Sequence, residues 1–230
     1  MSEVIPPARR AGAVAQRLIE ERLGEPVETI NRVIWPDPEL PEIVERWLDR
    51  YLPDVVHLRA ASYWVTYESV PLRLRRKGRL GVLADIGAAA GARPRFASTA
   101  SFRVVRRAAV RLIGGDTYFT PEEAAGTVAA TLRRIVMRES LVTVVRGPFR
   151  PFNSSGTRAG HLRAEHRYAR FESSLLSVCG ELRVPYLSMG NLFAGEPPLP
   201  DEVHGQEGTH AKIGKLEGEA IVHAVLELRR

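Results

Sequence analysis

Short runs of β-branched residues alternate along this chain with longer segments whose apolar residues keep helical spacing. Parallel strands cannot be joined by a tight turn, so helix-length connections between strands indicate a parallel sheet with helices on both faces. The pattern predicts a three-layer α/β/α fold. The predicted strands are residues 27–35, 55–60, 141–146 and 184–188, and the predicted helices are residues 8–23, 40–51, 121–138, 164–182 and 209–228. The start of the helix at 121–138 is marked by Thr120 as N-cap, Pro121 at the first helical position and Glu123, which completes a capping box.

The size of the chain predicts one domain, residues 1–230. With 44% hydrophobic residues, it can form one well-buried core. Its only cysteine, Cys179, lies among apolar residues at helical spacing, so we expect a buried thiol and a reducing compartment. Residues 1–10 show no signal peptide and no apolar run reaches membrane-spanning length, so a soluble, cytoplasmic protein is expected.

Arginine supplies most of the net charge of +6 and is concentrated in residues 69–116. Such a segment most often faces solvent, but it can also hold nucleic acid, an anionic membrane surface or an acidic substrate. No zinc-ligand spacing, RNA-binding aromatic signature or helix-turn-helix pattern accompanies it, so nucleic acid is not the expected partner. We expect residues 69–116 to form a basic insertion or lid.

A carboxylate and an imidazole lie three residues apart in Asp201-x-x-His204, between the last predicted strand and the last predicted helix. Asp201 can then accept a hydrogen bond from one ring nitrogen of His204, which leaves the other nitrogen to take a proton from a nucleophile. This spacing also arises by chance on solvated loops. The position of the pair after a predicted strand favours a catalytic role, because reactive groups in parallel sheets collect on loops beyond the carboxyl ends of strands.

Hydroxyl groups follow two other predicted strands. Ser62 comes after the strand at 55–60, and Ser154 and Ser155 follow the strand at 141–146. Because the carboxyl ends of parallel strands lie at one edge of a sheet, three loops are expected to converge on one pocket.

The end of the chain resembles the SGNH, or GDSL-type, hydrolases. The resemblance is carried by the strand Val-Pro-Tyr-Leu-Ser, by Asp201-x-x-His204 and by Gly208-Thr209-His210 at the start of the last helix, and the order of elements follows the family over nearly the whole chain. It implies a flavodoxin-like topology and an esterase that transfers an acyl or acetyl group to water without a cofactor. His204 is then the general base, and Asp201 fixes its tautomer.

The nucleophile of that family is not found in this sequence. No Gly-Asp-Ser occurs, and the strand that would carry it would precede the helix at 8–23, where only residues 1–7 lie. Either the first strand and its serine are encoded upstream of Met1, or the chain is a divergent or inactive homologue. The first explanation is favoured, because loss of a central strand leaves unpaired backbone groups on both neighbours. Ser154 and Ser155 are weak internal candidates, since Asn-Ser-Ser-Gly is also ordinary turn sequence.

The oxyanion-hole blocks of the family are also altered. Trp35-Pro36 stands where the family has a glycine, and residues 60–63 stand where it has Gly-x-Asn-Asp. The hydroxyl of Ser62 can still donate a hydrogen bond to an oxyanion. Loss of one donor costs about a hundredfold or more in rate, so these changes predict a poor catalyst.

No metal site is expected. His57 lies inside a predicted strand and is interpreted as a packed core residue, and His161, Glu165 and His166 lack further ligands. The expected partner is a small-molecule or carbohydrate ester, with the oligomeric state undetermined. The alternative is a non-catalytic protein of the same fold that binds a polyanion or a protein through residues 69–116. A nucleotide binder is disfavoured because no glycine-rich phosphate loop follows a strand.

Overall fold

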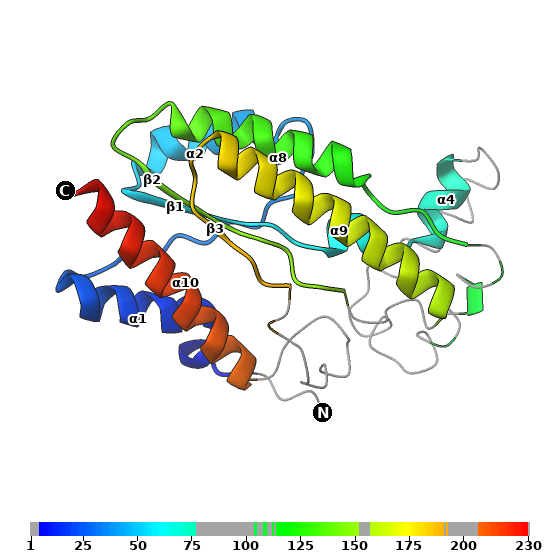
Figure 1. The fold of residues 1–230 in the computed structure, drawn as a ribbon, viewed down its shortest axis with the longest axis horizontal. Coiled ribbons are helices and arrows are strands. Elements are labelled where there is room, and N and C mark those ends of the chain that lie inside the picture. The colour runs from blue at the N-terminus through cyan, green and yellow to red at the C-terminus, as the bar shows by residue number, and fades with distance from the viewer. Residues whose placement is uncertain are drawn as a thin grey trace.

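Three parallel strands form one sheet in the order β1-β2-β3. A computed structural model of the chain describes residues 5–76, 114–151, 157–190 and 207–229, together with residues 104, 108, 109, 112 and 192. The mixed α/β fold and the parallel sheet are confirmed in this part of the chain (Figure 1). The strands are β1 Val55–Arg59, β2 Val142–Arg146 and β3 Tyr186–Leu187.

The helices follow the predicted periodicity closely. The longest, α9, begins six residues earlier than predicted, because the hydroxyl of Thr157 accepts a hydrogen bond from the amide of Gly160 at 3.0 Å and caps the helix. Two short helices, α3 and α4, lie in a stretch whose sequence showed no regular pattern. The described helices are the 3-10 helix η1 Pro7–Arg9, α1 Ala11–Leu23, α2 Leu40–Tyr51, α3 Tyr63–Thr66, α4 Val70–Arg76, α8 Pro121–Val136, α9 Arg158–Glu181 and α10 Glu207–Leu228.

The start of α8 is fixed by the capping box that the sequence predicts. The hydroxyl of Thr120 accepts a hydrogen bond from the amide of Glu123 at 3.1 Å, and the Glu123 carboxylate accepts one from the amide of Thr120 at 2.8 Å. Pro121 occupies the first helical turn, where its missing N–H costs nothing.

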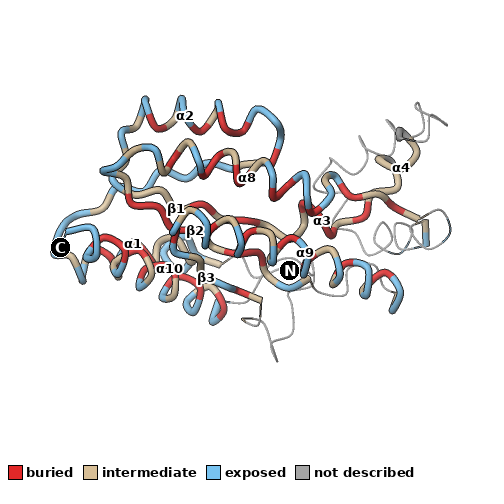
Figure 2. Tube along the Cα trace, turned by 45° about the horizontal axis from the view of Figure 1, so that its top comes forward, coloured by how far each residue is buried: buried red, intermediate tan, exposed pale blue. Residues whose placement is uncertain are grey.

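Helices cover both faces of the sheet. Leu58 and Val145 face the layer formed by α2, α8 and α9, whereas Val142 and Val144 face the layer formed by α1 and α10 (Figures 1 and 2). This separation follows from the strand period of two, which points successive side chains to opposite faces. Cys179 packs in the larger core as a free thiol, and burial raises its pKa to about 11. None of the described helices is long and apolar enough to cross a bilayer.

The helices α1 and α10 approach closely through two glycines on α10. A Cβ on Gly214 would lie 2.5 Å from the carbonyl oxygen of Ala11, and one on Gly218 would lie 3.1 Å from Leu18. Because a side chain at either position would push the helices apart, this spacing sets how α10 lies against α1. Glu217, between the two glycines, is fully buried.

The prediction of a strand at residues 27–35 is wrong. The structure gives this stretch no regular hydrogen-bonded structure, and Ile30 and Val33 are exposed, with Val33 at 84%. The amide and carbonyl of Val27 are satisfied by the side chains of Glu20 and Gln16 instead of by a strand. The composition is typical of a strand, but β-branched residues form one only beside a neighbouring backbone.

β1 is an edge strand in the described part of the chain. It pairs with β2 in register from Val55↔Val142 to Arg59↔Arg146, and no described strand takes its outer edge. An unpaired strand edge presents a row of N–H and C=O groups that can pair with another strand.

The predicted insertion at residues 69–116 lies largely outside the described residues, but its two ends meet. The amide of Ser69 donates to the carbonyl of Asp116 at 2.8 Å, and the amide of Asp116 donates back at 3.1 Å. The two ends of the segment are therefore adjacent in the fold.

Truncation of a core leucine tests the packing of the larger core. Leu132 on α8 is fully buried, so Leu132→Ala is expected to lower the free energy of unfolding in urea by about 2–5 kcal/mol. Leu226→Ala is the matched control, since Leu226 is also helical but 44% exposed and should cost less than about 1 kcal/mol. Equal losses in the two variants would contradict the assigned core.

Candidate functional site at the carboxyl edge of the sheet

Only one of the predicted site residues lies in the described part of the chain. Ser62 is half-buried in the turn that joins β1 to α3, and its carbonyl oxygen accepts hydrogen bonds from the amides of Val65 and Thr66 at 3.1 and 3.0 Å. It therefore lies directly beyond the carboxyl end of β1, as predicted. Four predicted residues fall outside the described ranges: Asp201, His204, Ser154 and Ser155.

Two arginines end the first two strands side by side. Arg59 and Arg146 are the last residues of β1 and β2 and are register partners, so their side chains leave the same face of the sheet. On that face α10 contributes Glu217, whose side chain is fully buried. Its Oε2 accepts a hydrogen bond from Arg59 Nη2 at 2.8 Å, and its Oε1 accepts one from Arg146 Nη1 at 3.3 Å. One carboxylate is thus shared by two guanidinium groups.

His57 lies on the same face of β1 and is neutral. Its Nε2 is 4.0 Å from Glu217 Oε1, and its side chain is only 11% exposed. Burial, together with the charges of Arg59 and Arg146, lowers the pKa of His57 to about 3. The expectation of a packed histidine within a strand is confirmed.

Arg146 remains charged despite its burial. Burial lowers its pKa to about 10, although the Glu217 carboxylate opposes this shift. Its guanidinium also stacks on the ring of Phe149, 4.6 Å from the ring centroid, and donates a hydrogen bond to the carbonyl of Ala60 at 3.4 Å. The cluster formed by Arg59, Arg146, Glu217 and His57, here called the Glu217 cluster, therefore joins two guanidinium groups, one carboxylate and one neutral imidazole.

Two buried phenols lie where β3 leaves the sheet. Burial raises the pKa of both Tyr168 and Tyr186, so both hydroxyls stay protonated. Gly147 leaves room for the hydroxyl of Tyr186, because a Cβ at this position would clash with it. Nearby, Ser188 donates a hydrogen bond to the carboxylate of Glu172 at 2.7 Å. Glu172, Arg150 and Glu165 are the charged groups that act on Tyr168.

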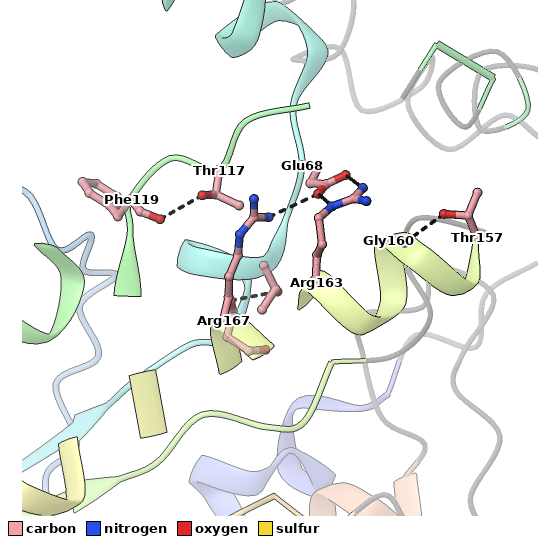
Figure 3. A network of polar contacts seen from close by, with 9 residues as sticks. Glu68, Thr117, Phe119, Thr157, Gly160, Arg163 and Arg167 are labelled. Atoms are coloured by element: carbon pink, nitrogen blue, oxygen red, sulfur yellow. Dashed lines mark hydrogen bonds and ion pairs between the residues drawn. The ribbon is translucent and has the colours of Figure 1, made fainter. Parts of the chain in front are cut away.

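A second buried carboxylate joins the start of the 69–116 segment to α9. Glu68 is 5% exposed and accepts two hydrogen bonds from Arg163, at 3.1 and 3.2 Å, and one from Arg167, at 3.2 Å (Figure 3). A bidentate guanidinium pair of this kind fixes both position and orientation.

A shallow, open hollow of about 500 Å³ lies where α9 meets the first turn of α8. Leu162 and Pro121 are among its lining residues, and its charged lining is mostly basic. The charged and imidazole side chains around it are Arg163, His166, Arg167, Arg170 and Glu122.

No metal centre is formed by the described residues. No group of three or more His, Cys, Asp or Glu side chains among them is arranged to hold an ion. His161 and Glu165 form an i,i+4 pair at 3.6 Å, and Arg150 donates to the same carboxylate at 2.8 Å. Glu165 is thereby engaged in ion pairs.

Sequence reasoning missed the Glu217 cluster. Glu217 lies four residues after Ile213 and four before Ile221, in the centre of the apolar stripe of the last helix. A carboxylate in that position has to be buried with a cationic partner, which is the signal that could have found it. The partners themselves are not visible in local spacing, since Arg59 is 158 positions away.

Neither a family model, nor a curated protein, nor a solved structure matches this chain. The fold and the carboxyl edge define its class. It is an α/β protein whose parallel sheet is covered by helices on both faces and whose first two strands end in a charged cluster.

The neutral state of His57 predicts a loss of stability in acid. Its pKa is lowered from 6.5 to about 3 on folding, so between these values the unfolded chain binds a proton that the folded chain excludes. The contribution of neutral His57 to the free energy of unfolding is therefore fully present above pH 6.5. It falls by up to about 1.4 kcal/mol per pH unit as the pH drops towards 3. When the free energy of unfolding in urea is measured from pH 7 to pH 4, it should fall less steeply with decreasing pH in His57→Leu than in the parent. His223→Leu, at an exposed histidine, should keep the parental slope.

Two carboxylates pair with arginines of α9, and their loss should lower the free energy of unfolding by different amounts. Glu68→Gln leaves Arg163 and Arg167 without their buried acceptor and is expected to cost about 1–3 kcal/mol of unfolding free energy. Glu122→Gln breaks an exposed pair with Arg170 and should cost no more than about 1 kcal/mol. Thermal unfolding of both variants at low and high salt distinguishes a buried pair from an exposed one. A loss of stability in Glu68→Gln that disappears at high salt would contradict the buried role of Glu68.

Proposed function

We propose that this chain is an SGNH-type serine hydrolase domain that cleaves an ester or acetyl group by acyl transfer to water. The observation that carries the proposal is the position of Asp201-x-x-His204 in the sequence between β3 and α10, in a chain whose described part forms a parallel sheet covered by helices on both faces. Connections that follow the carboxyl ends of strands are where such sheets carry their reactive groups.

The chemistry assigned to these residues is that of a hydrolytic triad. His204 takes the proton of the attacking serine and returns it to the leaving alcohol, while Asp201 holds the imidazole in the required tautomer. Ser62, beyond the carboxyl end of β1, is the proposed side-chain donor to the oxyanion. No cofactor takes part in this reaction scheme.

The nucleophile is proposed to lie on a further strand that pairs with the outer edge of β1. One observation supports this placement: β1 has no described neighbour on that edge. A strand paired there in parallel would end beside Ser62. Ser154 and Ser155 remain the internal alternatives.

The proposed substrate is a small-molecule or carbohydrate ester, with a polar or anionic group favoured by the arginines of residues 69–116. A cytoplasmic location is part of the proposal, supported by the buried free thiol of Cys179.

The second candidate is a non-catalytic protein of the same fold that binds a polyanion or a protein partner. It is favoured by the hollow beside α9, where Arg163, His166, Arg167 and Arg170 follow one another over successive turns. Binding of heparin without ester turnover would support this candidate over the hydrolase.

Turnover of p-nitrophenyl acetate tests the hydrolase directly, using the gene product with any coding sequence upstream of Met1 included. His204→Ala is expected to lower kcat by about a thousandfold or more, because the general base is lost. His223→Ala is the matched control and should change kcat less than about twofold, since His223 is exposed on α10 and lies outside the proposed site. Equal rates for the parent and His204→Ala would remove the enzyme claim.

A further inference from the structure

Among the residues that the structure describes, the Glu217 cluster has one negative charge fewer than it has positive charges. Arg59 and Arg146 share a single carboxylate, and His57 beside them is neutral. Charges with restricted access to water are costly unless they are paired. The cluster is therefore complementary to one further monoanionic group.

The two arginines also retain hydrogen-bonding capacity. Among the described residues, neither Arg59 Nε nor Arg146 Nε has a hydrogen-bond partner, although both atoms are buried. A guanidinium carries five N–H donors, and Glu217 takes one from each arginine. The unsatisfied donors lie at adjacent strand ends, so one group can engage both side chains.

Access to the cluster is through Arg59. Its side chain is 34% exposed, compared with 13% for Arg146 and 0% for Glu217. Gly12 on α1 faces it without a side chain, since even a Cβ there would lie 3.9 Å from Arg59 Nη2. A ligand can approach Arg59 from this side without displacing the core.

We propose that Arg59, supported by Arg146, binds the carboxylate group of a ligand at the carboxyl edge of the sheet. A planar carboxylate matches the guanidinium fork, and one negative charge neutralises the cluster. The role of Glu217 is to hold both arginines in place, and His57 keeps the adjacent position uncharged. This site is a property of the folded chain and does not depend on hydrolysis.

Simple solvation of Arg59 makes the opposite prediction. A solvated arginine responds to ionic strength and does not distinguish acetate from chloride. A built carboxylate site saturates with acetate at constant ionic strength, because its fork geometry is not matched by a spherical ion.

Titration with sodium acetate against sodium chloride at constant ionic strength tests the proposal, with the arginine Nε–Hε signals in ¹H–¹⁵N spectra as the readout. Saturable shifts are expected for Arg59 and Arg146. Arg59→Gln should weaken acetate binding about tenfold or more, whereas Arg229→Gln, at an exposed pair with Glu25, should leave it unchanged. Equal response to chloride, the absence of saturation, or full binding in Arg59→Gln would overturn the proposal.

A second variant gives a result that non-specific binding does not produce. Glu217→Gln keeps one side-chain oxygen that can accept from the arginines but removes the competing negative charge. The folded variant should therefore bind acetate about tenfold more tightly, and acetate should raise its Tm more than that of the parent. Weaker binding in a folded Glu217→Gln would overturn the proposal. If that variant does not fold, Arg59→Gln and its control decide alone. A lack of esterase activity has no bearing on either measurement.

Discussion

The buried carboxylate of Glu217 is the interaction on which the arrangement of the carboxyl edge depends. Its side chain is fully buried, in line with Ile213 and Ile221 on the inner face of α10. A charge in that position is tolerated only because Arg59 and Arg146 donate to it from two strands at once. The pairing fixes where α10 lies along the strands, and so it also fixes where the connection that ends at α10 rejoins the sheet.

A second carboxylate shared by two arginines joins α9 to the residues that follow α3. Glu68, nearly as buried as Glu217, is shared by Arg163 and Arg167 on α9. In each case two arginines surround one acid, which leaves an excess positive charge close to the carboxyl end of the sheet. Part of the arginine content of the chain is therefore structural, and the local surplus of cations is what gives this edge its affinity for anionic groups.

Local sequence signals predicted the elements whose cause is local. The capping box at Thr120 and the helical periodicity of α8 and α10 depend on neighbours three or four positions away, and they agree with the structure. The strand expected at residues 27–35 failed because strand formation requires a distant partner. Glu217 and Glu68 were missed for the same reason, since their arginines come from remote segments. The strand before Ser62 was predicted from its own residues, and Ser62 follows it in the structure as expected.

A double-mutant cycle between Glu217 and Arg146 measures how strongly the shared carboxylate joins α10 to the strands. Unfolding free energies are measured for the parent, Glu217→Gln, Arg146→Gln and the double variant. If the shared carboxylate joins α10 to the strands, the two changes are coupled by about 1.5 kcal/mol or more. Additive effects, within about 0.5 kcal/mol, would show that the two side chains do not depend on each other and would contradict the account.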